Sequence, residues 1–449
     1  MNNMFYLLNM SVAGIKSIKE EVRLDFYKKT VDKSFDPDKY RIKAIYGENG
    51  SGKSAIITAV SIFQKLIVYD NYLNESKTQV FLDEIINKTT KKFRFSCEFL
   101  ADINASLVIY NYSIEVGKND SGLYEIQSEV LKIKNGNYAN KNYKKIFECR
   151  NGELLYIKCD DAEREILEKK SINLLLTHSF IFIYSAYMAN LNKDIKNSVD
   201  VKKDRGLLIH MLMCSTLLLV INVYLGEEDQ HELYFLRKRL KENKLDNQVL
   251  QEGILEYGEF ANAFSSVNEK IVEKKHFENY KDKVERLTQF IKIFKPDLVS
   301  IDIDAKEKGD QYECELNLNY GNYSINKEFE STGIKKLIRL FDCFVAASTV
   351  GIVFVDEMDS NLNDVYLCKL LEYFMYYGKG QLCFTTHNLD PMTILKENRN
   401  SIDFLSSDNH LVPWTARGNA SPENCYKNGM IEDSPFNIDA TDFVGILGE

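Results

Sequence analysis

The chain has 449 residues and a formal net charge of −9, with 45% hydrophobic and 27% charged residues. A chain of this length can hold two or three substructures around a sizeable core, and this composition excludes a largely disordered protein. The negative charge argues against a protein that coats nucleic acid. Nine cysteines without a C-x-x-C pair indicate neither a disulfide framework nor a zinc site. Since the first residues lack a basic stretch and a small-residue cleavage site, we expect a cytoplasmic protein.

The stretch YGENGSGKSA, residues 46–55, follows two strands that we predict within residues 5–26. It matches G-x-x-x-x-G-K-[ST] and lies between an apolar strand, IKAIY, and an amphipathic helix, SAIITAVSIFQKL. In this setting the loop amides bind phosphate, Lys53 reaches the β- and γ-phosphates of a nucleotide, and Ser54 binds Mg²⁺. The predicted nucleotide-binding residues are Gly47, Asn49, Gly50, Ser51, Gly52, Lys53 and Ser54. A glycine-rich turn without a ligand is the alternative, which the flanking strand and helix disfavour.

The following part of the chain changes from strands to helices. KFRFSCEFL, LVIYNYSIEV and KIFECRNGELLYI are β-rich runs separated by turn residues, which predicts an antiparallel sheet. From about residue 160 to 298 the apolar spacing becomes helical, for example in residues 231–243 and 267–294. Residues 207–225 are nearly long enough to cross a bilayer, but they include His210 and Asn222. We therefore favour a buried helix over a membrane span.

Two acidic motifs follow, once strand patterns return after residue 298. Asp302 and Asp304 form a D-x-D pair that could bind a metal ion, but two outward acids on an alternating strand are the commoner case. TVGIVFVDEMD is an apolar strand that ends in Asp356 and Glu357, at the edge of a sheet where a nucleotide would lie. Asp356 would hold the Mg²⁺, and Glu357 would orient and deprotonate the attacking water.

Two further segments could complete a nucleotide site. QLCFTTHN ends an apolar strand with His387, which can sense a γ-phosphate if it lies beside the carboxylate strand, although a lone histidine is more often a satisfied polar residue. ESTGIKKLIRLFDCFVAAS predicts a helix that starts at Ser331, Thr332 and Gly333. These residues could be a simple helix cap. They could also bind a second anion, which the nucleotide of a partner subunit would supply.

Residues 401–449 are acidic, with eight acids and two bases and therefore a balance of −6. A segment of this sign is repelled by phosphate backbones. Its ending, SPFNIDATDFVGILGE, alternates apolar residues with acids, which suits docking on a protein. A closing strand and loop of the same domain is the alternative, and the sequence leaves it open.

The order of these motifs resembles the head of an ABC-class ATPase. GENGSGKS corresponds to Walker A, STGIKK to the signature, VFVDEMD to Walker B, DSNLN to the D-loop and TTHN to the switch histidine. More narrowly, the chain resembles ATPases of the OLD/SMC-related group, common in bacterial phage-defence operons, over about residues 1–160 and 300–449. The signature reads Glu-Ser-Thr-Gly where transporters have Leu-Ser-Gly-Gly, and Gln79 is only a weak candidate for a Q-loop.

This resemblance implies an α/β fold, an ABC-type ATPase head with a P-loop mixed sheet, an antiparallel β-subdomain and an inserted helical subdomain. The implied division is an N-terminal part of the head at 1–160, a helical insertion at 161–299, a C-terminal part of the head at 300–400 and an acidic segment at 401–449. The implied cofactors are ATP and Mg²⁺, with Ser54 and Asp356 as metal ligands and Glu357 and His387 as catalytic residues. The implied assembly is an ATP-sandwich homodimer, in which Ser331, Thr332 and Gly333 of one copy contact the nucleotide of the other.

The chain departs from two members of that group. It lacks the long heptad segments of chromosome-tethering SMC proteins. Only 62 residues without a D-x-D motif follow His387, so we expect no toprim nuclease domain in the same chain, unlike in OLD nucleases. The length and compact helical insert look most like the ATPase subunits of the AriA (PARIS) and AbiL type, and less like PtuA (Septu).

We therefore expect an ATP-hydrolysing sensor and scaffold subunit of a phage-defence system. Its expected partners are further copies of the chain, a separately encoded effector of the toprim nuclease type, and a phage protein or DNA as trigger. A DNA-repair or DNA-binding ATPase that acts directly on nucleic acid is the alternative. No membrane partner is expected.

Overall fold

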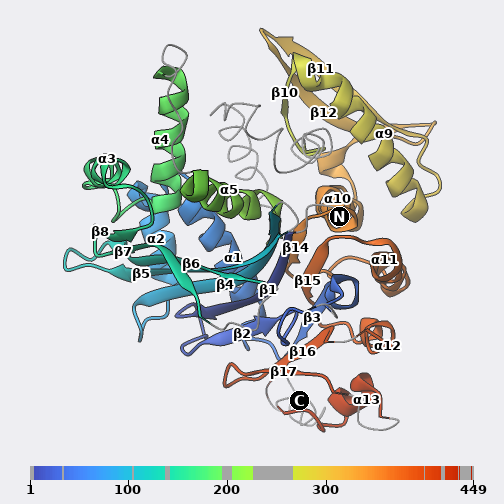
Figure 1. The fold of residues 1–449 in the computed structure, drawn as a ribbon. Coiled ribbons are helices and arrows are strands. Elements are labelled where there is room, and N and C mark those ends of the chain that lie inside the picture. Colours follow the sequence, from blue (N-terminus) through green and yellow to red (C-terminus); the bar gives the residue numbers. More distant parts are fainter. Residues whose placement is uncertain are drawn as a thin grey trace.

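The computed structural model describes residues 5–32, 35–103, 106–136, 142–194, 205–225, 266–398, 400–415, 420–432, 434 and 446. These residues form two large sheets, a smaller third sheet and the helices that cover them (Figure 1).

One of the large sheets is antiparallel and has seven strands. They are β1 (Phe5–Ala13), β2 (Val22–Asp25), β4 (Lys92–Ile103), β5 (Ser106–Lys118), β6 (Tyr124–Asn135), β7 (Lys144–Arg150) and β8 (Glu153–Ile157). Their order is β2-β1-β4-β5-β6-β7-β8. In β4, buried side chains alternate with more exposed ones at the start of the strand, as expected for a sheet with one covered face. The predictions of two strands before the phosphate loop and of an antiparallel sheet after it are confirmed.

The second large sheet carries the phosphate loop. Its strands are β3 (Ile42–Tyr46), β9 (Ile221–Tyr224), β14 (Ile352–Val355), β15 (Gln381–Thr385), β16 (Ile402–Leu405) and β17 (Leu411–Pro413). Their order is β17-β16-β3-β15-β14-β9, and every pair is parallel except β16 with β17. Strands β3, β14 and β15 are buried along their whole length. Both faces of this sheet are therefore covered, which explains why these strands read as continuous apolar runs.

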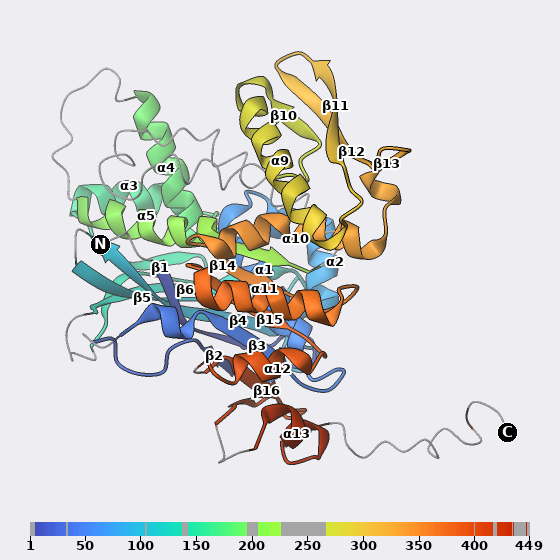
Figure 2. The same cartoon turned by 90° about the vertical axis from the view of Figure 1, so that its right-hand side faces the viewer.

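Helix α1 (Lys53–Val68) lies between the two large sheets, and 13 of its 16 residues are buried. On one side, Phe63 stacks on Phe95 of the antiparallel sheet, with 4.2 Å between ring centroids. On the other side, Ile45 and Phe354 of the parallel sheet belong to the same core. The opposite face of the parallel sheet packs on α10 (Thr332–Ser348), α11 (Asp364–Tyr377) and α12 (Asp390–Leu395), which lie in front of it in Figure 2.

A lobe beside α10 contains the third, antiparallel sheet. The strands of this sheet are β10 (Ile271–Glu273), β11 (Ser300–Lys308), β12 (Gln311–Asn319) and β13 (Ser324–Asn326). The lobe also contains helix α9 (Phe277–Phe294). Phe290 of α9 packs its ring on Phe341 and Phe344 of α10, which joins the lobe to the parallel sheet. The strands predicted after residue 298 are confirmed.

The remaining described helices lie around these layers. They are α2 (Ser76–Ile85), α3 (Asp161–Ser171), α4 (Phe180–Asp194), α5 (Arg205–Val220) and α13 (Pro422–Lys427), with 3₁₀ turns at Pro37–Tyr40, Tyr72–Asn74, Lys274–His276 and Lys327–Phe329. Figure 1 shows α3, α4 and α5 on the side of the antiparallel sheet. Within the described ranges, no helix is both long and apolar enough to cross a membrane.

Two predicted helices are shorter in the structure. The helix predicted over 207–225 ends at Val220, and its last residues form β9 in parallel with β14. Ile221, Val223 and Tyr224 are β-branched or aromatic and favour a strand once a buried neighbouring strand is available. The helix predicted over 267–294 begins at Phe277, because residues 271–273 pair with β12 as β10.

Some predictions fall on residues that the structure does not describe. The predicted helix at 231–243 lies outside the described residues, as does most of the ending 434–449. Of the acidic segment, residues 402–413 contain the hairpin of β16 and β17. The division of the chain at 160, 299 and 400 stays a prediction.

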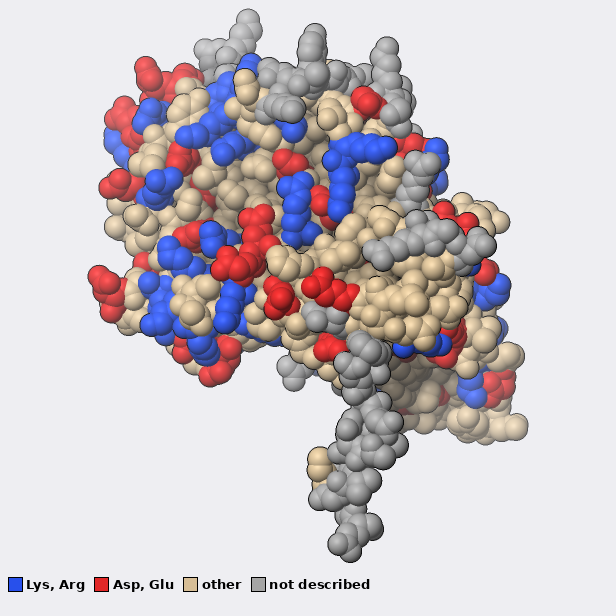
Figure 3. All heavy atoms as spheres, turned by 90° about the horizontal axis from the view of Figure 1, so that it is seen from below, with Lys and Arg blue, Asp and Glu red and all other residues tan. Residues whose placement is uncertain are grey.

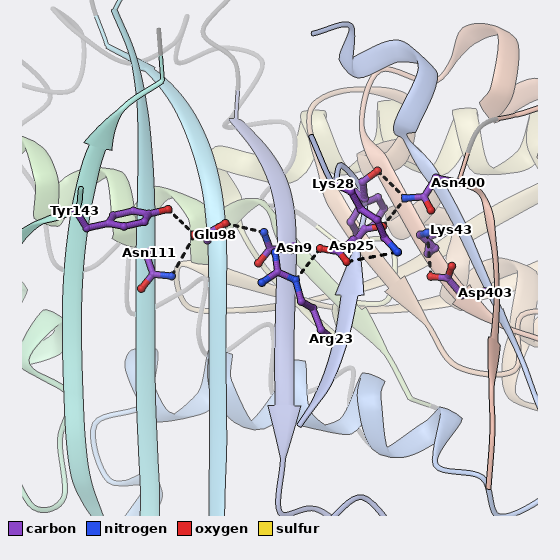
Figure 4. Close-up of polar contacts among 11 residues, drawn as sticks. Asn9, Arg23, Asp25, Lys28, Lys43, Glu98, Asn111, Tyr143, Asn400 and Asp403 are labelled. Atoms are coloured by element: carbon purple, nitrogen blue, oxygen red, sulfur yellow. Dashed lines mark hydrogen bonds and ion pairs between the residues drawn. The ribbon is translucent and has the colours of Figure 1, made fainter. Parts of the chain in front are cut away.

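Side-chain hydrogen bonds fix the two large sheets to each other. Gln381 of β15 accepts a hydrogen bond from Leu7 N at 2.7 Å and donates one to Leu7 O at 2.9 Å. Leu7 lies at an irregularity in β1, where β1 is free to bond outside its own sheet. Nearby, Asn400 donates to the backbone oxygen of Asp25, the last residue of β2, at 2.8 Å (Figure 4). The strands of the nucleotide site are thus held against a rigid second layer.

Candidate nucleotide site

Three neighbouring parallel strands end at the same edge of the sheet. In the order β3-β15-β14, they end at Tyr46, Thr385 and Val355. The phosphate loop, the TTH segment and the Asp-Glu pair follow these strand ends directly. The strand that precedes His387 pairs with the strand that precedes Asp356 and Glu357, so the condition stated above for a γ-phosphate sensor is met.

The loop from Gly47 to Gly52 curls around the lysine that follows it. Lys53 is 6% exposed, and its Nζ donates to the backbone oxygens of Gly47 at 2.7 Å and Glu48 at 2.8 Å. A Cβ atom on Gly47 would lie 2.5 Å from Leu405 O, and Gly52 has a φ of 110° at the start of α1. Side chains at these two positions would open the loop, so both glycines are required by its shape.

The loop is also braced by the hairpin of β16 and β17. The turn of this hairpin presents Asn409, which is 9% exposed and donates to Ser51 O at 3.2 Å. The bond joins residues 358 positions apart in the chain. No local sequence pattern predicts a contact between residues so far apart in the chain, and the sequence analysis missed it.

Thr385 organises the two carboxylates at the end of β14. Its hydroxyl donates to Asp356 Oδ1 at 2.5 Å and accepts from Glu357 N at 2.7 Å. Glu357 is exposed and has a φ of 48°, an uncommon conformation for a residue other than glycine. The sequence analysis assigned no role to Thr385 and missed this contact.

The ionisable side chains that follow the three strand ends shift one another's pKa. Burial lowers the pKa of Lys53, and the charges of Asp356, Glu357 and Asp359 oppose that effect. The pKa of His387 is also lowered, first by partial burial and then by the charge of Lys53, while the three carboxylates raise it. His387 is therefore mostly neutral near pH 7 and can donate or accept a hydrogen bond without carrying a charge. The structure thus brings together the predicted site residues Lys53, Asp356, Glu357 and His387, and Asp359 of the D-loop.

The predicted signature residues lie at the start of α10 and against the D-loop of the same chain. Ser331 caps the helix by accepting from Ile334 N at 3.4 Å. Thr332 donates to Asn361 Oδ1 at 3.4 Å, and a Cβ atom on Gly333 would lie 2.7 Å from Asn361 O. Ser331 is thus a helix cap, and both Ser331 and Thr332 remain exposed.

Two other sequence candidates have structural contacts. The amide of Gln79 pairs with the backbone N and O of Tyr124, at 2.8 and 3.1 Å, which fixes α2 to β6. Asp302 and Asp304 are exposed on β11, where Asp302 accepts from Ser300 Oγ at 2.8 Å.

The loop and its surroundings fit a nucleotide triphosphate with Mg²⁺. Ser51 Oγ is buried, and it has no hydrogen-bond partner among the described residues, so a donor is ready for a ligand oxygen. The start of α1 adds backbone amides. Ser54 and Asp356 are oxygen ligands of the type that Mg²⁺ shares with phosphates. Within the described ranges no group of three or more His, Cys, Asp or Glu could hold a metal, but a nucleotide-bound Mg²⁺ needs only one or two carboxylates.

One protein family matches the part of the chain that carries this site. A family profile described as "AAA domain, putative AbiEii toxin, Type IV TA system" matches residues 42–390. No curated protein matches the chain at a significant level.

Among solved structures, the chain is similar to "Structure of the recombination mediator protein RecF-ATPrS in RecFOR pathway", with 14% identity, a TM-score of 0.39 and coverage of 92% of this chain and 99% of that chain. It is also similar to the corresponding RecF-ATP structure, with 14% identity, a TM-score of 0.38 and coverage of 92% and 100%. A likeness this remote carries nothing about the ligands of the present chain. The family match runs from β3 to the residues after the switch histidine and covers the whole candidate site. The chain therefore belongs to the family of AAA domains that bears this description.

Proposed function

We propose that the chain binds and hydrolyses ATP with Mg²⁺, dimerises through ATP sandwiches, and controls a separately encoded effector in bacterial phage defence. The single observation that supports this most strongly is that one chain carries two half-sites. The loop around Lys53 with Asp356 and Glu357 is one half, and the exposed start of α10 at Ser331 is the other.

The residues of the first half-site support the proposed hydrolysis. The loop amides and Lys53 bind the phosphates, and Ser54 with Asp356 holds the Mg²⁺, which neutralises charge on the phosphates. Glu357 takes a proton from the attacking water. His387 donates a hydrogen bond to the γ-phosphate, which its lowered pKa allows without adding a second cation beside Lys53.

The second half-site supports the proposed dimerisation. Ser331, Thr332 and Gly333 begin a 17-residue helix whose positive end favours an anion. Their hydrogen bonds within the chain are with residues of α10, with Asn361 and with Glu330, whose carboxylate accepts from Ser331 N at 2.9 Å. Ser331 and Thr332 stay exposed, so the nucleotide of a second copy can reach them. ATP would then join the two copies, and hydrolysis would release them.

The role in defence rests on the family and on the resemblance. The family description names a toxin and a toxin–antitoxin system. The further choice of a subunit of the AriA (PARIS) or AbiL type, with a toprim-type nuclease as effector, rests on the resemblance of motif order and length alone.

The test combines co-expression with the product of the neighbouring gene and an assay of ATP turnover. We expect Mg²⁺-dependent hydrolysis that Lys53→Ala abolishes and that the exposed control Lys369→Ala leaves unchanged. We also expect a complex with the neighbouring protein whose amount depends on ATP. Normal turnover by Lys53→Ala would overturn the site, and the absence of a complex would overturn the effector role.

Adding DNA to the same assay separates the alternative function. A protein that acts on DNA is expected to present a basic stripe, whereas Lys and Arg side chains are interspersed with Asp and Glu on the face seen in Figure 3. We expect DNA to leave the ATPase rate unchanged. Strong stimulation by DNA that collapses as salt is raised would favour a DNA-acting ATPase.

A further inference from the structure

A buried lysine joins the start of α10 to the loop after β14. Lys336 lies five residues after Ser331 and is 5% exposed. Its Nζ donates to Glu357 O at 2.6 Å and to Ser360 O at 2.7 Å, and it also donates to Ser360 Oγ. A buried ammonium group is unfavourable unless all its protons are bonded. Here all three acceptors belong to one short loop.

This loop sets the position of the proposed general base. Glu357 has a φ of 48°, and such backbone conformations persist only where neighbouring groups hold them. Its N–H is bonded to Thr385 Oγ1 at 2.7 Å, and its backbone oxygen is bonded to Lys336 at 2.6 Å. The backbone of Glu357 is therefore held on both sides, once by the sheet and once by α10.

The same helix touches the loop at a second place. Thr332 donates to Asn361 Oδ1 at 3.4 Å, and Gly333 is so close to Asn361 O that a Cβ would lie 2.7 Å from it. Residues 332 and 336 are one helical turn apart and lie on one side of α10. Two contacts one turn apart therefore connect the helix start to the loop.

We propose that Lys336 is a positioning residue that couples the helix start at Ser331 to Glu357. When a second copy's nucleotide binds at Ser331, the helix shifts slightly, and Lys336 carries that shift to the backbone of Glu357. This inference rests on the proposed function, because it assumes that Ser331 contacts the nucleotide of a second copy and that Glu357 activates water. Lys336 would link these two residues.

The charge of Lys336 fits this role. Burial lowers its pKa to about 8, while Asp359, Glu357 and Asp356 act in the opposite direction. Near pH 7 the group is therefore still an ammonium with three protons for its three acceptors.

The test compares Lys336→Met with Lys369→Met, an exposed lysine of α11 that pairs with Glu372. For Lys336→Met we expect kcat for ATP to fall about 10-fold or more while KM changes less than about 3-fold, because binding of ATP is kept and only positioning is lost. Lys336→Arg should recover part of kcat, because it restores donors at the same place. Lys369→Met should match the wild type in both constants.

Hydrogen–deuterium exchange of residues 357–362 in the nucleotide-free protein gives a readout that does not need hydrolysis. We expect faster exchange in Lys336→Met and unchanged exchange in Lys369→Met. If Lys336→Met does not fold, Ser360→Ala removes one acceptor and should show the same two effects to a smaller extent.

Unchanged exchange with unchanged kcat would overturn the inference, and so would equal losses of ATP binding and kcat. If the wild type itself does not hydrolyse ATP, the proposed function fails, and the exchange experiment alone decides whether Lys336 holds the loop.

Discussion

Thr385 Oγ1 lies 2.5 Å from Asp356 Oδ1 and donates a hydrogen bond to it. Because the same hydroxyl accepts from Glu357 N and Thr385 is 1% exposed, the central strand of the sheet sets the position of both carboxylates at the end of its neighbour.

The first prediction removes that hydroxyl. Thr385→Val keeps the shape of the side chain but leaves a carboxylate oxygen and an N–H without their partner, which should cost about 1–3 kcal/mol of stability. We expect ATP turnover to fall by about 10- to 100-fold, because neither carboxylate keeps its orientation. Steady-state kinetics of the purified protein checks this, with Thr385→Ser as the control that retains the hydroxyl. Wild-type turnover in Thr385→Val would show that the bond is dispensable.

The second prediction concerns the contact between Gly333 and Asn361. In a free helix, Gly to Ala would stabilise by about 1 kcal/mol. Here the added Cβ would meet a backbone oxygen at 2.7 Å, so we expect Gly333→Ala to destabilise by about 1–3 kcal/mol. Urea unfolding of both proteins shows directly whether Gly333→Ala lowers or raises the free energy of unfolding. A more stable Gly333→Ala protein would mean that α10 and the loop at 361 do not pack as closely as described.

The third prediction uses the buried ion pair of Lys43 and Asp403, seen beside β2 in Figure 4. The two charges lie 2.9 Å apart with 0% and 5% of the side chains exposed. Burial raises the pKa of Asp403, and the charge of Lys43 opposes that effect. Lys43→Met should therefore cost about 3–5 kcal/mol, because it leaves a buried carboxyl group without its partner.

The double variant Lys43→Met, Asp403→Leu is the control for this pair. It replaces both charges with apolar groups and should recover most of the stability lost in the single variant. Urea unfolding of both proteins decides the question. A double variant as unstable as Lys43→Met would show that packing, and not an unpaired charge, causes the loss.

The fourth prediction concerns pH and Glu129 of β6. Glu129 is fully buried and accepts from Tyr112 Oη and Phe180 N, both at 2.7 Å. Burial raises its pKa from 4.5 to about 7, while these hydrogen bonds oppose the shift. Between these pH values the folded protein holds a proton that the unfolded chain has released, so this contribution to stability falls as pH rises.

Glu129→Gln removes the titration and isolates its effect. The free energy of unfolding of the wild type, relative to that of Glu129→Gln, should fall by about 3 kcal/mol between pH 4.5 and 7.5. Unfolding curves of both proteins over this range measure the difference. A constant difference would mean that Glu129 stays ionised in the folded protein.

Much of the fold could be predicted because its signals are local. The strand before Gly47 and the strand before Asp356 are buried on both faces and read as apolar runs, and the strands of the antiparallel sheet alternate. Strand β9 could not be predicted, because INVY continues an apolar helix and only its pairing with β14 makes it a strand.

The site was predictable where one short motif carries it. The phosphate loop, the Asp-Glu pair and His387 each follow a strand, so parallel strands bring them to one edge. The contacts of Thr385 and Lys336 could not be predicted, because they join residues 28 and 21 positions apart through the packing of separate elements. The spacing of residues along the chain does not show which side chains meet when separate elements pack together.

The central claim is that ATP joins two copies of this chain. Light scattering coupled to size exclusion tests it with Glu357→Gln, which binds ATP but should not hydrolyse it. With Mg²⁺ and saturating ATP, we expect the mass to rise from that of one chain, 51.9 kDa, to twice that value, and Lys53→Ala should stay at the lower mass. An unchanged mass of Glu357→Gln with bound ATP would contradict the account.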